Sequence, residues 1–154
     1  MTYYDRTPGA ATDGSPTFGT AADTGNEDAA RARLEAAWNC TLHHFGQLSP
    51  IDWYALRHGR MVALVEIKTR THSVDKFPTV FLNLRKWLAL MLGGVGHGVP
   101  IFFAVQWTDS LRWINVADID ARAIAMGGCS RVVKSRSDVE PVINVPVANM
   151  RAVA

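Results

Sequence analysis

Residues 50–69, PIDWYALRHGRMVALVEIKT, decide the fold of this chain. Two runs rich in aliphatic, aromatic and β-branched residues, 51–57 and 61–68, are separated by the short polar link 58–60, and this pattern predicts a β-hairpin. The second run is apolar on both faces along 61–65, as expected of a central strand that is covered by helices. We therefore expect this hairpin in the middle of a sheet.

The length of the link predicts which residues face each other across the hairpin. A three-residue link pairs residues whose numbers sum to 118, so that Asp52 lies opposite Glu66. Because side chains alternate along a strand, Lys68 shares the face of Glu66. Opposed carboxylates repel each other, and burying them among Val, Ile and Leu is costly unless they are paired or bind a metal. The alternatives are a cation site and an ion pair of these three residues without chemistry.

A cation site of this composition suggests phosphoryl chemistry. Two carboxylates with open coordination positions suit Mg²⁺, which takes oxygen ligands and usually keeps several waters. Phosphate oxygens could complete its shell. The ion would polarise a phosphodiester and lower the pKa of bound water, while Lys68 would hold or help activate the attacking water.

Helices are expected on both sides of the hairpin in the sequence. Thr24 and Glu27 are spaced as a capping box, and apolar residues recur at helical spacing over about 26–38, which predicts a first helix. Pro78 fits the first turn of a second helix that ends at Gly93 and Gly94. Its buried stripe is predicted to consist of Val80, Phe81, Leu84, Leu88 and Met91.

Further strands are expected around these elements, at 40–45, 99–107 and 111–116. Residues 118–126 are predicted to form a short helix, and 141–147 an edge strand. The order helix, three strands, helix, strands predicts an α/β fold of the mixed α+β kind, with a central mixed β-sheet flanked by helices.

Composition indicates one globular domain. The chain has 154 residues, of which 48% are hydrophobic and 19% charged, as in ordinary globular proteins. Residues 1–25 are rich in Thr, Gly, Ala, Asp and Pro without apolar periodicity, so we expect a flexible tail followed by a single domain over 26–154. Neither a membrane-spanning run nor a secretory signal is recognised, which predicts a cytoplasmic protein that does not insert into membranes.

Charge is distributed unevenly along the chain. Residues 1–30 carry five acidic side chains and one basic one, a net charge of −4, whereas the rest carries fifteen basic and nine acidic ones, a net charge of +6. A moderately positive folded part is compatible with a phosphate-bearing partner such as nucleic acid.

Asp52, separated by thirteen residues from Glu66-Ile67-Lys68, resembles the active-site signature of the PD-(D/E)XK nuclease superfamily. The expected order of elements is similar to the αβββαβ core of this restriction-endonuclease-like fold, with the Asp on the second strand and the E-x-K on the third. The resemblance covers about residues 26–116. It departs from the family pattern where Pro50, rather than residue 51, is the proline before the Asp.

The resemblance implies roles for further residues. Glu35 matches the helix acid that many members place near the metal, the alternative being a solvated helix charge beside Arg31. The backbone carbonyl of Ile67 would contact the metal. Lys86 matches a Lys or Gln that members often carry near the active site, the alternative being an exposed helix lysine next to Arg85.

Taken together, the resemblance implies a deoxyribonuclease that uses Mg²⁺, with Mn²⁺ as a substitute, to hydrolyse phosphodiester bonds of DNA. Thr69, Arg70, Arg85 and Lys86 are the residues expected to contact DNA. Small nucleases of this kind often act as dimers, so a homodimer is an expected assembly. The competing interpretations are a non-catalytic nucleic-acid-binding module on the same fold and a hydrolase of small phosphate esters.

Overall fold

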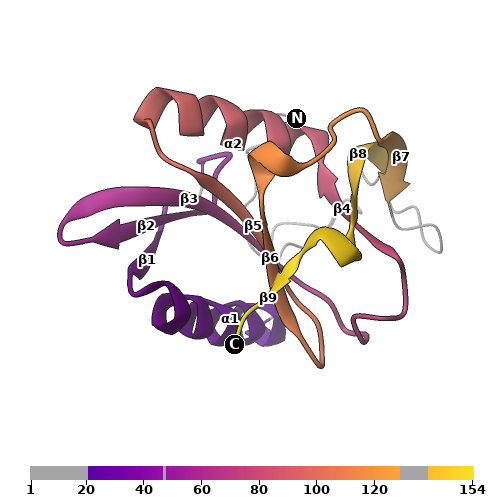
Figure 1. Cartoon of the computed structure of the whole chain (residues 1–154), viewed down its shortest axis with the longest axis horizontal. Coiled ribbons are helices and arrows are strands. Elements are labelled where there is room, and N and C mark those ends of the chain that lie inside the picture. The colour runs from indigo at the N-terminus through magenta and orange to yellow at the C-terminus, as the bar shows by residue number, and fades with distance from the viewer. Residues whose placement is uncertain (1–20, 47, 129–138) are drawn as a thin grey trace, which may run out of the picture.

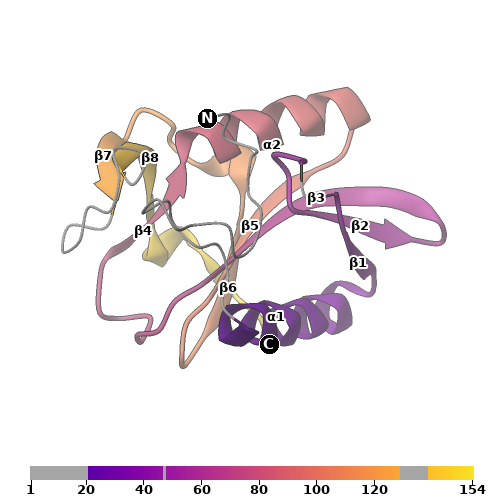
Figure 2. The same cartoon turned by 180° about the vertical axis from the view of Figure 1, so that it is seen from behind.

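The computed structural model describes residues 21–46, 48–128 and 139–154. A mixed sheet lies between two helices, α1 below it and α2 above it in Figure 1, and the view from behind in Figure 2 shows the same layers. The elements are α1 (Ala21–Trp38), β1 (Thr41–His44), β2 (Trp53–Arg57), β3 (Arg60–Thr69), β4 (Thr79–Asn83), α2 (Leu84–His97), β5 (Ile101–Gln106), β6 (Leu111–Asn115), η1 (Val116–Asp118), β7 (Ile124–Gly128), β8 (Val139–Pro146), η3 (Val147–Asn149) and β9 (Arg151–Ala152).

The large sheet has the strand order β1-β2-β3-β5-β6-β9. Strands β3 and β5 pair in parallel, whereas the other neighbouring strands pair antiparallel. A parallel pair needs a crossover connection, and the segment that contains α2 supplies it. The predicted mixed sheet with flanking helices, and the predicted position of the hairpin at its centre, are therefore confirmed.

Two apolar cores lie on the two faces of this sheet. Leu34 of α1 packs with Val65 and Ile67 on one face, and Leu90 of α2 packs with Leu64 on the other. Because side chains alternate along β3, the residues at positions 64, 66 and 68 face α2, and those at 65 and 67 face α1. The acidic and basic residues of β3 are thereby directed to the α2 side.

The hairpin reaches its expected register by an unexpected route. Its turn consists of two residues, His58 (φ 51°) and Gly59 (φ 72°), whose positive φ angles fit the tight hairpin turns that match the twist of the strands. The predicted three-residue link is therefore wrong. A β-bulge between Ala55 and Leu56 shifts the pairing by one residue, so Trp53 pairs with Val65. The numbers of paired residues beyond the bulge sum to 118, as predicted.

Helix α1 starts earlier than expected. Its first residue is Ala21, so the helix already runs through Thr24, and the predicted capping box does not mark its beginning. Residues 21–25, assigned from composition to the flexible tail, are helical. The remainder of the predicted tail, residues 1–20, lies outside the described residues.

Among the described residues, no helix combines the length and the apolarity needed to cross a bilayer.

The segment after Pro78 is not the start of a helix, because Thr79–Asn83 forms β4. Val80 and Leu82 are buried and alternate with less buried neighbours, which is the period of a strand. Helix α2 begins only at Leu84, and it buries Lys86 and Leu90, whereas Leu88 of the predicted stripe is 46% exposed. The apolar residues of this segment fit both a helical and a strand period, so the sequence pattern did not distinguish the two.

The two glycines predicted to end α2 lie inside it. The helix continues to His97, and Gly98 follows in the left-handed conformation (φ 64°). A Cβ on Gly93 would lie 2.7 Å from side-chain atoms of Ile51 and Leu64, and one on Gly94 would lie 2.8 Å from Ile101. These glycines allow α2 to approach the sheet closely.

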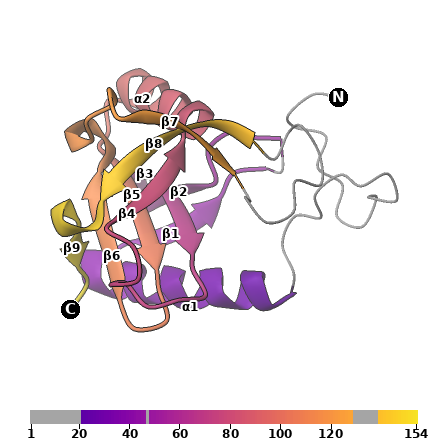
Figure 3. The ribbon, with the colours of Figure 1, turned by 90° about the vertical axis from the view of Figure 1, so that its right-hand side faces the viewer.

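The C-terminal part also differs from expectation. Residues 118–126 contain the end of η1 and the start of β7 rather than a short helix. Strand β8 is the middle strand of a small second sheet with the order β4-β8-β7, not an edge strand. Figure 3 shows this small sheet crossing beside the ends of the central strands, below α2. Long-range pairing of β8 with β4 cannot be read from local sequence.

Candidate active site

Asp52, Glu66 and Lys86 form a compact charge cluster on the α2 face of the large sheet. Lys86 Nζ lies 2.6 Å from Oδ1 of Asp52 and 3.1 Å from Oε2 of Glu66. The side chain of Lys86 is 9% exposed and that of Glu66 5%, whereas that of Asp52 is 37% exposed. One ammonium group therefore bridges two carboxylates, and the cluster meets solvent on the Asp52 side.

Backbone pairing fixes the positions of the two carboxylates. Asp52 directly precedes β2, and its carbonyl accepts the N–H of Phe45 at 3.0 Å, which ties this residue to the segment after β1. Glu66 lies inside β3 and pairs with Phe103 of β5. Glu66 is thus held by a central strand, and Asp52 by the end of the neighbouring one.

The carboxyl group of Glu66 has an unusual environment. Burial raises the pKa of Glu66, Lys86 opposes that rise, and the nearby Asp52 adds to it. Among the described residues, no hydrogen-bond partner reaches Oε2, although this buried atom is within ion-pair distance of Lys86. The charge of this buried oxygen is therefore compensated by the Lys86 ammonium group, as a buried carboxylate requires.

Lys68 shares the face of Glu66, as predicted, but its ammonium group is directed to the small sheet. Lys68 Nζ donates to Oδ1 of Asn83 at 3.1 Å and to the carbonyl of Phe81 at 3.3 Å, and it lies 4.4 Å from the centre of the Phe81 ring. Burial and then the positive charge of Arg70 lower the pKa of Lys68 from 10.5 to about 8. The ammonium group of Lys68 is therefore held by β4.

Lys86 is the lysine that compensates the charge of the two carboxylates. The alternative of an exposed helix lysine is contradicted by its burial and by its two carboxylate contacts. The carboxylates raise the pKa of Lys86 against the opposing effect of burial. Lys86 lies in the first turn of α2, which directly follows β4, and Asn83 at the end of β4 accepts a hydrogen bond from Lys68 of β3.

The residues predicted to contact DNA are distributed around the cluster. Thr69 and Arg70 follow Lys68 at the end of β3, and both are half-buried. Arg70 lies 5.1 Å from the Phe81 ring centre, and its buried Nη2 has no hydrogen-bond partner among the described residues. Arg85 lies exposed on α2, next to Lys86.

Glu35 is not brought to the cluster. It lies on α1, on the opposite side of the sheet, where its carboxylate accepts the backbone N–H of Leu42 at 2.7 Å and pairs with Arg31 at 3.4 Å. Its position therefore ties α1 to β1. The side chain of Ile67 is also buried on the α1 side, and only its backbone passes between Glu66 and Lys68.

Sequence reasoning missed the residues of the small sheet that surround Lys68. Asn83 donates from Nδ2 to Oε1 of Glu140 on β8, so that a chain of contacts joins β8, β4 and β3. Glu140 also raises the pKa of Lys68, as one of its smaller influences. The signal for Asn83 in the sequence was a polar residue at the end of the apolar run 80–82.

The donor atoms at the cluster fit a hard divalent cation with an incomplete protein shell. Asp52 and Glu66 supply carboxylate oxygens, and Oε2 of Glu66 is buried without a hydrogen bond. Within the described part of the chain, no group of three or more His, Cys, Asp and Glu residues is arranged to hold a metal. The remaining positions would fall to water, a backbone carbonyl or phosphate, which is how proteins usually bind Mg²⁺.

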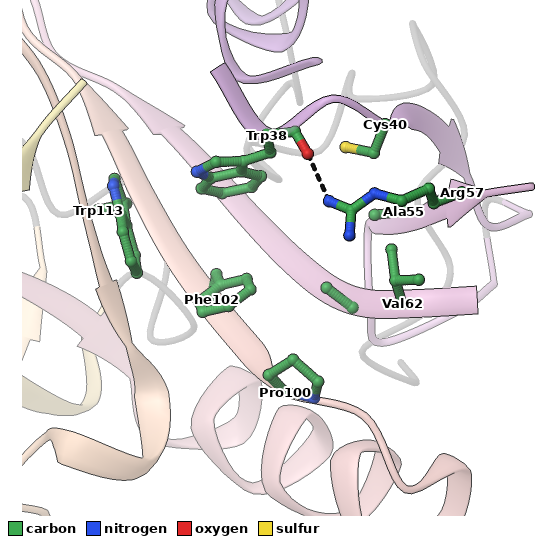
Figure 4. Close-up of a pocket in the computed structure, with 9 residues that line it drawn as sticks. Trp38, Cys40, Ala55, Arg57, Val62, Pro100, Phe102 and Trp113 are labelled. Atoms are coloured by element: carbon green, nitrogen blue, oxygen red, sulfur yellow. Dashed lines mark hydrogen bonds between the residues drawn. The ribbon is translucent and has the colours of Figure 1, made fainter. Parts of the chain in front are cut away.

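A separate apolar pocket of about 270 Å³ lies on the α1 side of the sheet. Figure 4 shows Trp38, Phe102 and Trp113 around it, with Arg57 donating to the carbonyl of Trp38. Because this pocket and Glu66 lie on opposite faces of β3, the pocket is not part of the charge cluster.

The fold and the cluster define a PD-(D/E)XK-type core: Asp52 beside β2, Glu66 and Lys68 on β3, and helix α2 crossing to a parallel strand. The sequence matches the family model described as "Phage putative PDDEXK endonuclease" over residues 14–153, and the chain belongs to this family.

A solved structure supports the fold assignment. The Holliday junction resolvase Hjc of Archaeoglobus fulgidus superposes with a TM-score of 0.53 and 13% sequence identity, over 81% of this chain and 84% of that one. At this identity the likeness establishes the fold alone. No curated protein matches the sequence.

Proposed function

We propose that this chain is a metal-dependent endonuclease that hydrolyses phosphodiester bonds of DNA. The observation that carries the proposal is the pair of carboxylates, Asp52 and Glu66, on the α2 face of the large sheet, where Glu66 shares β3 with the half-buried Lys68. The two carboxylates lie together on one face of the sheet, and the cluster meets solvent on the side of Asp52, whose side chain is 37% exposed. The family membership supports the same conclusion.

Each residue has a distinct part in the proposed reaction. Asp52 and Glu66 would hold Mg²⁺, or Mn²⁺ in its place, and the carbonyl of Ile67 is a further candidate ligand. When bound, the cation polarises the phosphodiester and lowers the pKa of an adjacent water. Lys68 would hold the attacking water and stabilise negative charge that develops on the phosphate. Its lowered pKa brings this ammonium closer to exchanging a proton near neutral pH.

DNA contacts are proposed for the residues next to the cluster. Thr69 is the last residue of β3, Arg70 follows it, and Arg85 lies exposed on α2. The buried Nη2 of Arg70 lacks a hydrogen-bond partner among the described residues, and a phosphate oxygen would satisfy it. Charged groups that contact phosphates position the DNA backbone and do not recognise the base sequence.

A cleavage assay tests the proposed function. The purified chain is incubated with linear, flapped, circular and four-way-junction DNA, with Mg²⁺, with Mn²⁺ and with chelator. The four-way junction is included because the superposed archaeal protein is a Holliday junction resolvase. We expect cleavage of at least one DNA form, and its loss in chelator. DNA binding without cleavage in every condition would instead support the non-catalytic module.

The Lys68→Ala variant tests the mechanism. Removing the ammonium group should lower the cleavage rate at least about 100-fold, which is the loss typical of one preorganised charge-stabilising group. The matched control is Lys76→Ala, which removes an exposed lysine and should retain the wild-type rate. Equal rates for Lys68→Ala and wild type would contradict the proposed part of Lys68.

The assembly is also proposed from the resemblance, as a homodimer. Sedimentation equilibrium across a concentration series measures it directly. A constant monomer mass would remove the dimer from the proposal without affecting the nuclease assignment.

A further inference from the structure

The position of Lys86 has a consequence for how a metal reaches the two carboxylates. Its ammonium group is 2.6 Å from Asp52 Oδ1 and 3.1 Å from Glu66 Oε2, and the Lys86 side chain is 9% exposed. Lys86 thereby offsets the repulsion between the two carboxylates that it contacts. A cation is already present at this position, and the chain itself supplies it.

A divalent ion and this ammonium group cannot occupy the same place. Mg²⁺ binds oxygen ligands at about 2.0–2.1 Å. An ion bound to the same two oxygen atoms would lie next to Lys86 Nζ, with strong repulsion in a site where Glu66 and Lys86 are buried. Buried surroundings screen such repulsion poorly.

We propose that Lys86 occupies the cation position of the metal-free protein and that its ammonium group must leave both carboxylates before a divalent ion binds. The inference rests on the proposed function, because it assumes that Asp52 and Glu66 are metal ligands. Lys86 is then a competitor of the metal as well as a stabiliser of the metal-free fold. The displaced Lys86 ammonium group would move toward solvent on the side of Asp52, whose side chain is 37% exposed.

Two properties follow from this competition. Metal affinity is lower than that of the same carboxylate pair without the lysine, since displacement of a bridging ammonium opposes binding. Removing the charge at position 86 also destabilises the metal-free protein, because two opposed carboxylates lose their partner. The same substitution therefore weakens the fold and strengthens metal binding, which a purely structural lysine would not do.

Calorimetric titration of Mn²⁺ and Mg²⁺ in the absence of DNA tests the proposal. The proteins compared are wild type, Lys86→Met, which keeps a similar length without the charge, and Lys86→Arg, which keeps a cation. The matched control Lys76→Met removes an exposed lysine charge elsewhere. We expect Lys86→Met to bind Mn²⁺ at least tenfold more tightly than wild type, and the other two variants to stay within about twofold of it.

A labelling experiment on the wild-type protein makes the test independent of variant folding. Lysine amines are reductively methylated with and without Mg²⁺, and the extent at each lysine is measured by mass spectrometry. Release from the carboxylates exposes the Lys86 amine, so its methylation should rise severalfold with Mg²⁺. The exposed Lys76 is the internal control and should not change.

The outcomes separate this inference from the proposed function. Tighter Mn²⁺ binding by Lys86→Met together with faster labelling of wild-type Lys86 supports it, even if no DNA form is cleaved. Equal or weaker Mn²⁺ binding by a folded Lys86→Met overturns it, as does absence of metal binding in both proteins. If Lys86→Met does not fold without metal, unchanged Lys86 labelling in wild type with Mg²⁺ overturns it.

Discussion

At the scale of single residues, the site contains two lysines with different surroundings. Lys68 donates to neutral oxygen atoms of Phe81 and Asn83, whereas Lys86 contacts two carboxylates. Burial lowers the pKa of both lysines. For Lys68 the positive charge of Arg70 lowers the pKa further, whereas for Lys86 the two carboxylates outweigh burial and raise the pKa. Lys68 is thus the better candidate for proton exchange, and Lys86 for charge compensation.

Glu35 provides a prediction at this scale. Glu35→Ala leaves the Leu42 N–H without its acceptor and removes the partner of Arg31, so we expect a loss of about 1–3 kcal/mol in the free energy of unfolding. Urea denaturation measures this loss. Because Glu35 lies on the α1 side of the sheet, Mn²⁺ affinity and cleavage rate should not change.

The Glu35→Gln variant is the control, because its amide oxygen can still accept the Leu42 N–H. It should retain most of the stability that Glu35→Ala loses. A tenfold loss of Mn²⁺ affinity in the glutamine variant would return Glu35 to the metal site that the family resemblance implied.

Among the elements, α2 owes its position to glycines that face the sheet. A Cβ at position 94 would lie 2.8 Å from Cγ2 of the buried Ile101 and 3.2 Å from the carbonyl oxygen of Val99. The branched side chain of Ile101 and the backbone of Val99 cannot move aside freely. Close approach of helix and sheet holds Lys86 over the carboxylates, so packing at one end of α2 supports the site at the other.

A matched pair of glycine substitutions tests this packing. Gly94→Ala should destabilise the protein by about 1–3 kcal/mol, because overpacking forces the sheet and helix apart. Gly96→Ala lies in the same helix, and apart from the chain neighbours and the backbone of the helix itself nothing lies within 4 Å of the added Cβ. This substitution should stabilise the protein by up to about 1 kcal/mol through helix propensity. Urea denaturation of both variants distinguishes them, and equal effects would refute the packing explanation.

Considered as a whole, the molecule encloses Lys68 between two sheets. The large sheet contributes Lys68 itself, and the small sheet contributes Asn83 from β4 and Glu140 from β8, which are joined by a hydrogen bond. The small sheet is therefore more than a covering of the α2-side core, because it orients the side chain that the proposed reaction requires.

Asn83→Ala tests this connection between the sheets. Loss of one of the two hydrogen bonds to Lys68 should lower kcat by about 10- to 100-fold with little change in KM, because misplacement of a reacting group affects the transition state. The control is Asn115→Ala, which removes the side-chain acceptor for Ala117 N–H at η1 and should leave kcat unchanged. A purely structural part for Asn83 would give similar kcat values in both variants.

The sequence determined the central hairpin and the location of the charged residues on it. The apolar run 61–65 predicted β3, and the alternation of side chains along a strand predicted the shared face of Glu66 and Lys68, since strand periodicity is a local property. The register beyond the bulge agrees with the prediction, but it arises from a two-residue turn and a β-bulge that the sequence did not reveal. The order of the core elements was predictable for the same reason, and the acid–lysine spacing indicated the nuclease superfamily.

Only the tertiary structure decided which charges meet. Lys86 compensates the carboxylates and Glu35 is separated from them, because packing of α1 and α2 on opposite faces of the sheet, rather than residue spacing, sets their positions. The conversion of 79–83 into a strand likewise depends on long-range pairing with β8. Burial of apolar side chains is non-directional, so the same apolar segment can be buried as a helix or as a strand. Pairing with a distant segment decides between the two.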